Sequence, residues 1–260
     1  MSAAFDLAGK TAFVSGASRG IGAAIAHLLA AQGAHVIVSS RKADGCQSVA
    51  DAIIQAGGQA TVMPCHIGDL DQIRQTFIHI GERFGSLDIL VNNAAINPQF
   101  GHILDTDAEA FQKTVDVNIR GYLFMSIEAG KLMRQAGTGG SIINIASVNG
   151  VSPGLMQGVY SITKAAVINL TKVFAKECAS FGIRCNALLP GLTDTRFASA
   201  LVNNPSILNL ALQQIPLKRV AQPDEMAGAV LYLASDASSY NHRYDPKRRR
   251  WPLGITAWAF

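Results

Sequence analysis

Three residues of this 260-residue chain have the types and spacing of an acid–base centre. Ser147 ends an apolar, strand-like run, and Tyr160 and Lys164 stand four positions apart in the helix-like stretch that follows. A separation of four places two side chains on one helix face. A nearby ammonium favours the phenolate and lowers the phenol's pKa. A phenol tuned in this way can exchange a proton with a reacting carbonyl or alcohol.

The Tyr160–Lys164 pair has a simpler explanation when it is taken alone. Many helices carry a buried tyrosine and a surface lysine at this spacing without any chemical role. The functional interpretation therefore depends on what else the chain contains.

A glycine-rich turn near the N-terminus is the second chemical feature. The strand-like run 11–15 leads into Gly16-Ala17-Ser18-Arg19-Gly20-Ile21-Gly22, and an apolar helical pattern follows over 23–32. This order can place a pyrophosphate on a helix N-terminus, and glycines let the phosphates approach the backbone. Tight turns also use glycine for backbone reasons alone. The position between strand and helix favours the nucleotide interpretation.

The end of the next strand-like run indicates which dinucleotide is bound. Many NAD-binding folds have an acid there to hold the ribose diol, whereas this chain has Ser39, Ser40 and Arg41. An acid would repel a 2′-phosphate, and an arginine can form a two-pronged contact with it. Arg19, in the glycine turn, points to the same region. Two solvated surface arginines are the alternative, and the pattern favours NADP(H) over NAD(H).

Composition indicates one large globular domain. Hydrophobic residues make up 49% of the chain and charged residues 15%, which excludes a disordered protein. No apolar run reaches membrane-spanning length, and the N-terminus lacks a secretory pattern. The four cysteines are scattered without a Cys-x-x-Cys pair, which fits neither a zinc site nor a disulfide framework. We therefore expect a cytoplasmic protein with no metal and no membrane contact.

Strand-like and helix-like segments alternate along the chain. Such alternation predicts an α/β fold of Rossmann type, a doubly wound parallel sheet with helices on both faces. Residues 192–218 follow the sixth predicted strand and look like a partly helical insertion over the strand ends. Ligands bind at that end of such sheets, so this insertion is a candidate substrate lid. The predicted strands are 11–15, 35–40, 61–64, 87–93, 141–146 and 184–189, and the predicted helices are 23–32, 43–56, 70–84, 108–135 and 158–181.

With these motifs in order, the chain resembles the short-chain dehydrogenase/reductase (SDR) family, and within it the NADP-dependent carbonyl and retinal reductases. The resemblance covers about residues 5–240. We take residues 1–240 as one dinucleotide-binding domain and 241–260 as an atypical basic tail. The matching positions are the glycine turn 16–22, Asn92-Asn93-Ala94-Ala95, Asn118, Ser147, Tyr160, Lys164 and Pro190-Gly191.

The resemblance implies a role for each member of a catalytic tetrad. Tyr160 would be the general acid in reduction and the general base in oxidation. Lys164 would hold the nicotinamide ribose and lower the Tyr160 pKa. Ser147 would hydrogen-bond the substrate oxygen, and Asn118 would position a water that links Lys164 to solvent. In the simpler alternative, Asn118 only bonds backbone and Ser147 only caps the following turn.

The resemblance also implies binding residues and a reaction. The reaction would be hydride transfer between NADP(H) and a small ketone or secondary alcohol. The alternatives are a 3-oxoacyl-thioester reductase acting on an acyl carrier protein and a non-catalytic nucleotide-binding scaffold. The expected cofactor-binding residues are Gly16, Ser18, Arg19, Gly20, Ile21, Gly22, Ser40, Arg41, Asn92, Ala94, Pro190 and Gly191. The expected substrate residues are Asn97, Pro153, Leu155 and Gln157, which suggest a largely apolar cavity.

The tail 241–260 departs from the family pattern. It carries the whole net charge of +4, so the body is neutral and no nucleic-acid partner is expected, although Lys247–Arg250 is a short basic run. Prolines at both ends of 246–252 argue against a central strand, and we predict that the seventh strand is missing. The resemblance implies a homodimer through helices 108–135 and 158–181, and it leaves a tetramer in doubt.

A shift of reading frame can explain the tail. Residues 241–252 can be encoded so that the same bases, read one position later, give Thr-Thr-Gly-Thr-Ile-Leu-Asn-Val-Asp-Gly-Gly. That string resembles the family's last strand. Sequencing the coding DNA tests this origin, because the hypothesis fails if no one-base offset yields the Asp-Gly-Gly strand.

Overall fold

The computed structural model describes residues 3–241 and 255–258. Among these residues, seven parallel strands form one sheet in the order β3-β2-β1-β4-β5-β6-β7. The order changes direction between β1 and β4, and at such a point a parallel sheet opens a crevice at its carboxyl end. The strands are β1 Thr11–Ser15, β2 His35–Ser39, β3 Gln59–Val62, β4 Ile89–Asn92, β5 Gly140–Ile145, β6 Ile183–Leu189 and β7 Ile255–Trp258.

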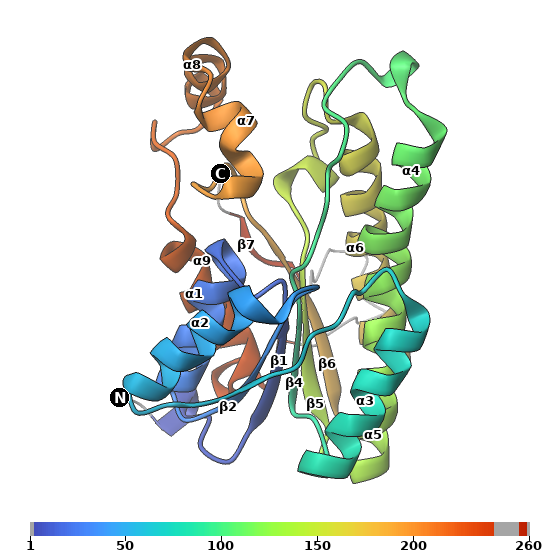
Figure 1. Ribbon diagram of the computed structural model, residues 1–260, viewed down its shortest axis with the longest axis vertical. Coiled ribbons are helices and arrows are strands. Elements are labelled where there is room, and N and C mark those ends of the chain that lie inside the picture. The colour runs from blue at the N-terminus through green and yellow to red at the C-terminus, as the bar shows by residue number, and fades with distance from the viewer. Residues whose placement is uncertain (1–2, 242–254, 259–260) are drawn as a thin grey trace.

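Helices cover both faces of the sheet, as the alternating pattern predicts (Figure 1). One face carries α1 Gly20–Ala31, α2 Ala43–Gln55 and α9 Pro223–Ala234, and the other carries α3 Leu70–Phe84, α4 Ala108–Val115, α5 Tyr122–Ala136 and α6 Gly158–Glu177. Along β1, Val14 belongs to the first core and Phe13 to the second, and both are fully buried. Because successive side chains point to opposite faces, a strand covered on both sides is apolar throughout. The doubly wound α/β prediction is confirmed.

The long helix predicted over 108–135 is interrupted. A π-helical turn, Asp116–Gly121, separates α4 from α5. At the end of this turn Gly121 lies so close to the backbone of Ile67 that a Cβ would stand 2.6 Å from the Ile67 carbonyl oxygen. Short π-helical turns occur frequently at functional sites, and this one contains Asn118.

The seventh strand corrects one expectation. β7 pairs in parallel with β6 between Ala187 and Leu189, with a shift of register between those two residues. The expectation that no strand forms in 241–260 is therefore wrong. The basic run and the two prolines on which that expectation was based lie in 242–254, outside the described residues. Without β7, the outer backbone edge of β6 would be unpaired, and such an edge can accept a strand. Isoleucine, threonine and tryptophan are also residue types that favour strands. The frame-shift origin of the tail stays a prediction.

The segment 192–218 is pinned at its base. It contains the 3₁₀ turn Arg196–Ala198 and the helices α7 Ser199–Val202 and α8 Pro205–Gln214 (Figure 1). At its two ends the Asp194 N–H donates to the Ala221 carbonyl at 2.8 Å, and the Ala221 N–H donates to the Leu192 carbonyl at 3.0 Å.

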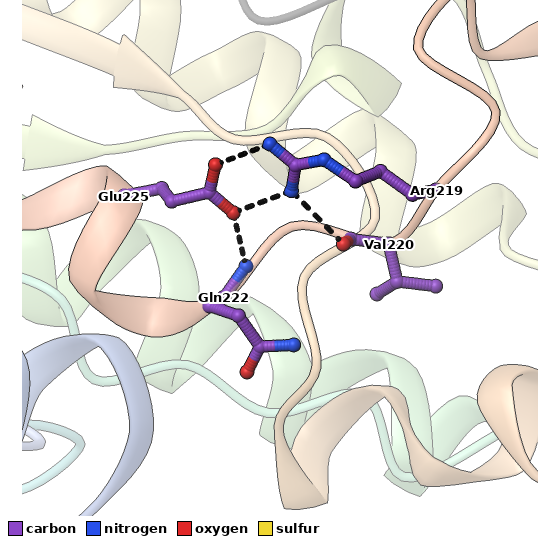
Figure 2. A network of polar contacts seen from close by, with 4 residues as sticks. All are labelled: Arg219, Val220, Gln222 and Glu225. Carbon is purple, nitrogen blue, oxygen red and sulfur yellow. Dashed lines mark hydrogen bonds and ion pairs between the residues drawn. The ribbon is translucent and has the colours of Figure 1, made fainter.

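A polar network holds the chain between this segment and α9. Figure 2 shows the Arg219 guanidinium bonded to both carboxylate oxygens of Glu225, at 2.6 and 2.7 Å. The Gln222 N–H, at the N-cap of α9, donates to the same carboxylate at 2.7 Å. Within the described residues, no helix is both long and apolar enough to cross a bilayer.

Candidate active site

The four residues of the predicted tetrad come from three elements at the carboxyl end of the sheet. Ser147 lies two residues after the end of β5, Tyr160 and Lys164 lie in the first two turns of α6, and Asn118 lies in the π-helical turn. The exposed fractions are 8% for Ser147 and Tyr160, 1% for Lys164 and 0% for Asn118. Buried polar groups need partners, so the contacts of each side chain define its role.

The Lys164 ammonium is held at the end of β5. Its Nζ donates to the Ile145 carbonyl at 2.7 Å and lies 3.4 Å from the Tyr122 hydroxyl. The same Nζ lies 5.0 Å from the Tyr122 ring centroid and 5.6 Å from that of Tyr160. A cation over two aromatic faces is stabilised by their quadrupoles, which partly offsets the loss of water.

Tyr122 is a member of this cluster that the sequence analysis missed. Its hydroxyl donates to the Ile145 carbonyl at 3.2 Å, and the side chain is fully buried. Burial is the main cause that raises its pKa well above the ordinary value, and the neighbouring Tyr160 adds to the effect. The signal was present, because Tyr122 follows Asn118 by four positions.

The pKa of the Tyr160 phenol is governed mainly by burial. Burial raises the Tyr160 pKa to about 12, and a hydrogen bond with the Ser147 side chain opposes that rise. Burial lowers the pKa of Lys164 to about 7. In this geometry Nζ is bonded to the Ile145 carbonyl and desolvation is the larger effect on the phenol, so the lowering of the Tyr160 pKa by Lys164 stays a prediction.

Asn118 uses its amide to join two segments. Its Oδ1 accepts from the Ile96 N–H at 2.9 Å, and its Nδ2 donates to the Ile96 carbonyl at 2.9 Å and to the Thr163 hydroxyl at 3.1 Å. Both amide hydrogens are thus used within the protein. Asn118 ties the loop after β4 to α6, next to Lys164, and only its remaining acceptor positions can hold a water.

Ser147 makes the turn cap considered from the sequence and a second contact, to Tyr160, that the sequence analysis did not consider. Its hydroxyl oxygen accepts from the Asn149 N–H at 3.1 Å, which caps the 3₁₀ turn Val148–Gly150. Its side chain also bonds the Tyr160 phenol. A hydroxyl has one hydrogen and two lone pairs, so the turn cap leaves its donor available.

The glycine turn has the close packing that a phosphate-binding loop requires. Gly16 and Gly20 have φ of 65° and 56°, the left-handed region that favours glycine. A Cβ on Gly16 would lie 2.8 Å from the Ala94 Cα, and one on Gly22 would strike the Gly16 carbonyl oxygen. The turn passes directly into the N-terminus of α1, so these residues fit a dinucleotide pyrophosphate.

Two neighbouring turns meet beside this loop. A Cβ on Gly45, in the first turn of α2, would stand 3.0 Å from the Ser18 Cβ. The segment with Arg41 and the turn with Arg19 are therefore adjacent, and both arginines are exposed. The Ser40 hydroxyl donates to the Lys42 carbonyl at 3.0 Å.

Asn92 lies elsewhere than predicted. It is fully buried, and its Nδ2 donates to the Ser126 hydroxyl at 3.0 Å and to Asn144 Oδ1 at 2.9 Å. Its side chain therefore points under α5 and not into the cofactor crevice. Asn93 holds the glycine turn instead, because its Nδ2 donates to the carbonyls of Ser15 and Gly16.

The remaining predicted residues lie around the strand ends. Pro190 follows β6, and its carbonyl accepts from the Val148 N–H at 3.1 Å, beside Ser147. Gly191 accepts from the Thr193 hydroxyl. Gln157 pairs with Gly101 in an isolated bridge, which joins the two loops that hold the predicted substrate residues. Ile21 lies in the first turn of α1, Ala94 packs on Gly16, Asn97 and Gln157 are half-buried, and Pro153 and Leu155 are exposed.

Comparisons with known proteins cover nearly the whole chain. The family model described as enoyl-(acyl carrier protein) reductase matches residues 16–242. Dehydrogenase/reductase SDR family member 4 of Oryctolagus cuniculus is 36% identical over 90% of both chains. The L-rhamnose 1-dehydrogenase (NAD(P)(+)) of Azotobacter vinelandii is 38% identical over 89% of this chain and 91% of its own.

Solved structures agree with this result. A gluconate 5-dehydrogenase of Burkholderia cenocepacia in complex with NADP and tartrate has a TM-score of 0.88 and 29% identity, over 97% of this chain and 94% of its own. The chain belongs to the short-chain dehydrogenase/reductase family. It is accordingly an oxidoreductase of the nicotinamide-dependent kind, and the resemblance inferred from the motifs is confirmed.

Proposed function

We propose that this SDR protein transfers a hydride between NADP(H) and a ketone or secondary alcohol, with Tyr160 as the general acid and base. The observation that carries the proposal is the burial of a phenol, an ammonium and a hydroxyl together at the end of β5. A scaffold has no use for such a cluster, because burying an ammonium is unfavourable unless the charge has a task.

The residues of the cluster have separate tasks in this mechanism. The nicotinamide, when bound, supplies or accepts the hydride. In reduction, the Ser147 hydroxyl donates to the substrate oxygen and Tyr160 gives its proton to the oxygen that becomes the alcohol. In oxidation, the Tyr160 oxygen takes that proton back. Lys164, near the phenol, favours the anionic form of Tyr160 during this exchange. Asn118 fixes the loop after β4 beside the path by which the proton leaves.

The preference for NADP(H) rests on charge. Arg19 and Arg41 are exposed on two adjacent turns, where no acidic side chain stands between Ser39 and Lys42. Their guanidinium groups can form charge-assisted hydrogen bonds with a 2′-phosphate. The gluconate 5-dehydrogenase neighbour was solved with NADP, which is in keeping with this choice.

Tyr160→Phe tests the mechanism, because it keeps the ring and removes the acidic proton. Turnover should fall by roughly 10²-fold or more, with NADPH binding nearly unchanged in a fluorescence titration. Tyr232→Phe, on α9, is the control and should keep wild-type turnover. Near-normal turnover of Tyr160→Phe would remove the mechanism.

One other activity has a specific observation in its favour. The matching family model is described as enoyl-(acyl carrier protein) reductase, which favours a thioester on an acyl carrier protein, and a 3-oxoacyl thioester is therefore the second candidate substrate class. Efficient reduction of an acyl-carrier-bound 3-oxo thioester, with slow reduction of free ketones, would favour it. Tight NADPH binding without turnover of either class would instead favour the non-catalytic scaffold.

We also propose a cytoplasmic homodimer. The free cysteines Cys46, Cys65, Cys178 and Cys185 suit a reducing compartment. Large apolar side chains are exposed on the two elements expected at the interface, namely Phe111 on α4 and Ile162 and Val173 on α6. Sedimentation equilibrium should give a dimer for the wild type and a smaller species for Ile162→Glu.

A further inference from the structure

One aromatic side chain of the insertion 192–218 contacts the proposed general acid. The Phe197 ring centroid lies 5.5 Å from that of Tyr160, at an interplanar angle of 46°. Aromatic pairs at this separation attract each other. Tyr160 is 8% exposed, whereas Phe197 is 49% exposed. Phe197 therefore has one side on the reacting phenol and a large part of its ring open to whatever binds there.

Other exposed apolar side chains stand on the loop that leads into α6. Leu155 is 91% exposed and Met156 is 45% exposed. Met156 also has φ of 62°, a conformation that is strained for any residue except glycine, and its carbonyl accepts from the Gly101 N–H at 2.9 Å. Backbone strain of this kind is kept where the surrounding structure holds a side chain for a function.

A small pocket lies beside this strained residue. It is about 10 Å³ in volume, and Ile103, Met156 and Val159 supply its apolar walls. Gly158 and Val159 also line this pocket, so it lies at the start of α6, the helix that carries Tyr160. Exposed apolar side chains thus stand on the insertion, which carries Phe197, and on the loop before α6, which carries Leu155 and Met156.

Charged side chains are almost absent from the same surroundings. The segments 96–104 and 148–157 contain no Asp, Glu, Lys or Arg. The segment 192–218 contains only Asp194, Arg196 and Lys218. Asp194 and Arg196 have opposite signs and stand two residues apart, and the Lys218 ammonium donates to the Gln213 carbonyl at 2.7 Å. A sugar acid brings a carboxylate that needs a cation or several donors to replace its water. Apolar substrate groups need only apolar area.

We propose that Phe197 determines substrate specificity and that the substrate is an uncharged alcohol or ketone whose apolar, ring-bearing group packs on the open face of Phe197. The inference rests on the proposed hydride transfer at Tyr160 and names the substrate class of that same site. The proposed substrate class differs from that of the relative named for gluconate, and the proposal places substrate recognition in the segment 192–218.

Oxidation of three alcohols with NADP tests the inference on the full chain. The probes are 1-phenylethanol, 2-propanol and D-gluconate, assayed with wild type, Phe197→Ala and Phe197→Tyr. The wild type should prefer 1-phenylethanol to D-gluconate in kcat/KM by about tenfold or more. Phe197→Ala should lose about three- to tenfold on 1-phenylethanol, mainly through KM, and should change little on 2-propanol. Phe197→Tyr keeps the ring and should restore the wild-type preference.

Phe181→Ala is the matched control. Phe181 is 43% exposed and carries the Arg134 guanidinium 5.4 Å from its ring centroid, just beyond the last turn of α6, so its loss should leave all three rates unchanged. A wild-type preference for D-gluconate, or equal losses on 1-phenylethanol and 2-propanol in Phe197→Ala, would overturn the inference while leaving the proposed function in place. Turnover of none of the three alcohols by NADP-binding wild type would overturn both.

Discussion

The acid–base cluster and the insertion 192–218 both lie at the proposed reaction site, but the cluster is buried and the insertion is largely exposed. In the cluster, Asn118 and Lys164 are at most 1% exposed and are bonded to fixed backbone carbonyls. In the insertion, α8 has no buried residue, and Leu210 and Leu217 are 63% and 70% exposed. Structure with little buried apolar contact opens at a lower free energy than a packed core does.

This contrast separates chemistry from recognition. The cluster derives its geometry from the sheet, because β5 supplies the Ile145 carbonyl and the turn with Ser147. The insertion is held at its base by the pairing of Thr193 with Ala221 and by the network at Arg219, and it contacts the cluster through the Phe197 ring. A change in the cluster should therefore affect every substrate, whereas a change in the insertion should affect substrates selectively.

The largest expected effect follows from replacing Lys164, the ammonium of the cluster, in Lys164→Met. Turnover should fall by roughly 10²-fold or more for all substrates, because no cation is left beside the phenol. The fold should survive, since an apolar side chain of similar length in a buried site is often as stable as the charge it replaces. Steady-state kinetics and thermal unfolding of the same preparation measure both effects. A collapsed fold would show that Lys164 is structural.

The same variant has a predictable dependence on pH. Burial lowers the folded-state pKa of Lys164 to about 7, below its ordinary 10.5. Between these two values the unfolded chain binds a proton that the folded chain does not, so stability from this group rises as pH increases from about 7 to about 10.5. Below pH 7 the folded protein holds a buried charge. The melting temperature of wild type relative to Lys164→Met should therefore increase over that range, and a constant difference would contradict the assignment.

The sequence predicted the sheet, the two helical layers and the position of the tetrad. Strand-turn-helix order and the four-residue spacing of Tyr160 and Lys164 depend on local geometry, which the sequence records directly. Asn92 was misplaced although the signal existed. Leu90 and Asn92 are two positions apart on one strand and share a face, and Leu90 belongs to the core under α5.

Other features could not be read from local pattern. The π-helical turn at Asn118 depends on packing against Ile67, a contact between distant parts of the chain. The rise of the Tyr160 pKa depends on burial, which spacing does not report. The seventh strand forms at the free edge of β6, so it depends on the partner edge more than on its own short sequence.

The next largest effect should come from replacing Arg41. This residue is exposed, as the insertion is, but it is proposed to select the cofactor and not the substrate. Arg41→Asp replaces a phosphate partner with a repelling charge, so NADPH affinity should fall by about ten- to hundredfold. NADH affinity should change much less. Fluorescence titration with both cofactors measures the ratio, and Lys131→Asp, at an exposed cation on α5, is the control for a general charge effect. A wild type that already prefers NADH would show the arginine argument to be wrong.

A smaller effect is expected at Tyr122, inside the cluster. Tyr122→Phe removes the hydroxyl 3.4 Å from Lys164 Nζ and keeps the ring that faces the ammonium. The pKa of Lys164 should fall further, because one stabilising dipole is lost. The pH profile of kcat should therefore shift to lower pH on its Lys164-dependent limb, with a roughly two- to tenfold loss at neutral pH. A loss of stability with an unshifted profile would mean that Tyr122 serves only packing.

The smallest effect concerns the base of the insertion and gives the sharpest test of the comparison. Arg219→Ala breaks the two bonds to Glu225 that Figure 2 shows, while the pairing of Thr193 with Ala221 stays. An exposed ion pair of this kind contributes modestly, so KM should rise by up to about fivefold with kcat nearly constant. The melting temperature should fall by less than about 2 °C.

Lowering the pH should break the Arg219–Glu225 pair in the wild type, as the Arg219→Ala substitution does. Hydrogen bonding to Arg219 lowers the pKa of Glu225 to about 2, below its ordinary 4.5. The contribution of the pair is therefore complete above about pH 4.5 and is lost as pH falls toward 2. Arg74→Ala, which breaks the exposed Arg74–Asp71 pair on α3, is the matched control and should leave KM unchanged. If both variants raise KM equally, the insertion is not anchored by Arg219. If Arg219→Ala lowers kcat for every substrate as Lys164→Met does, recognition and chemistry are not separate in this enzyme.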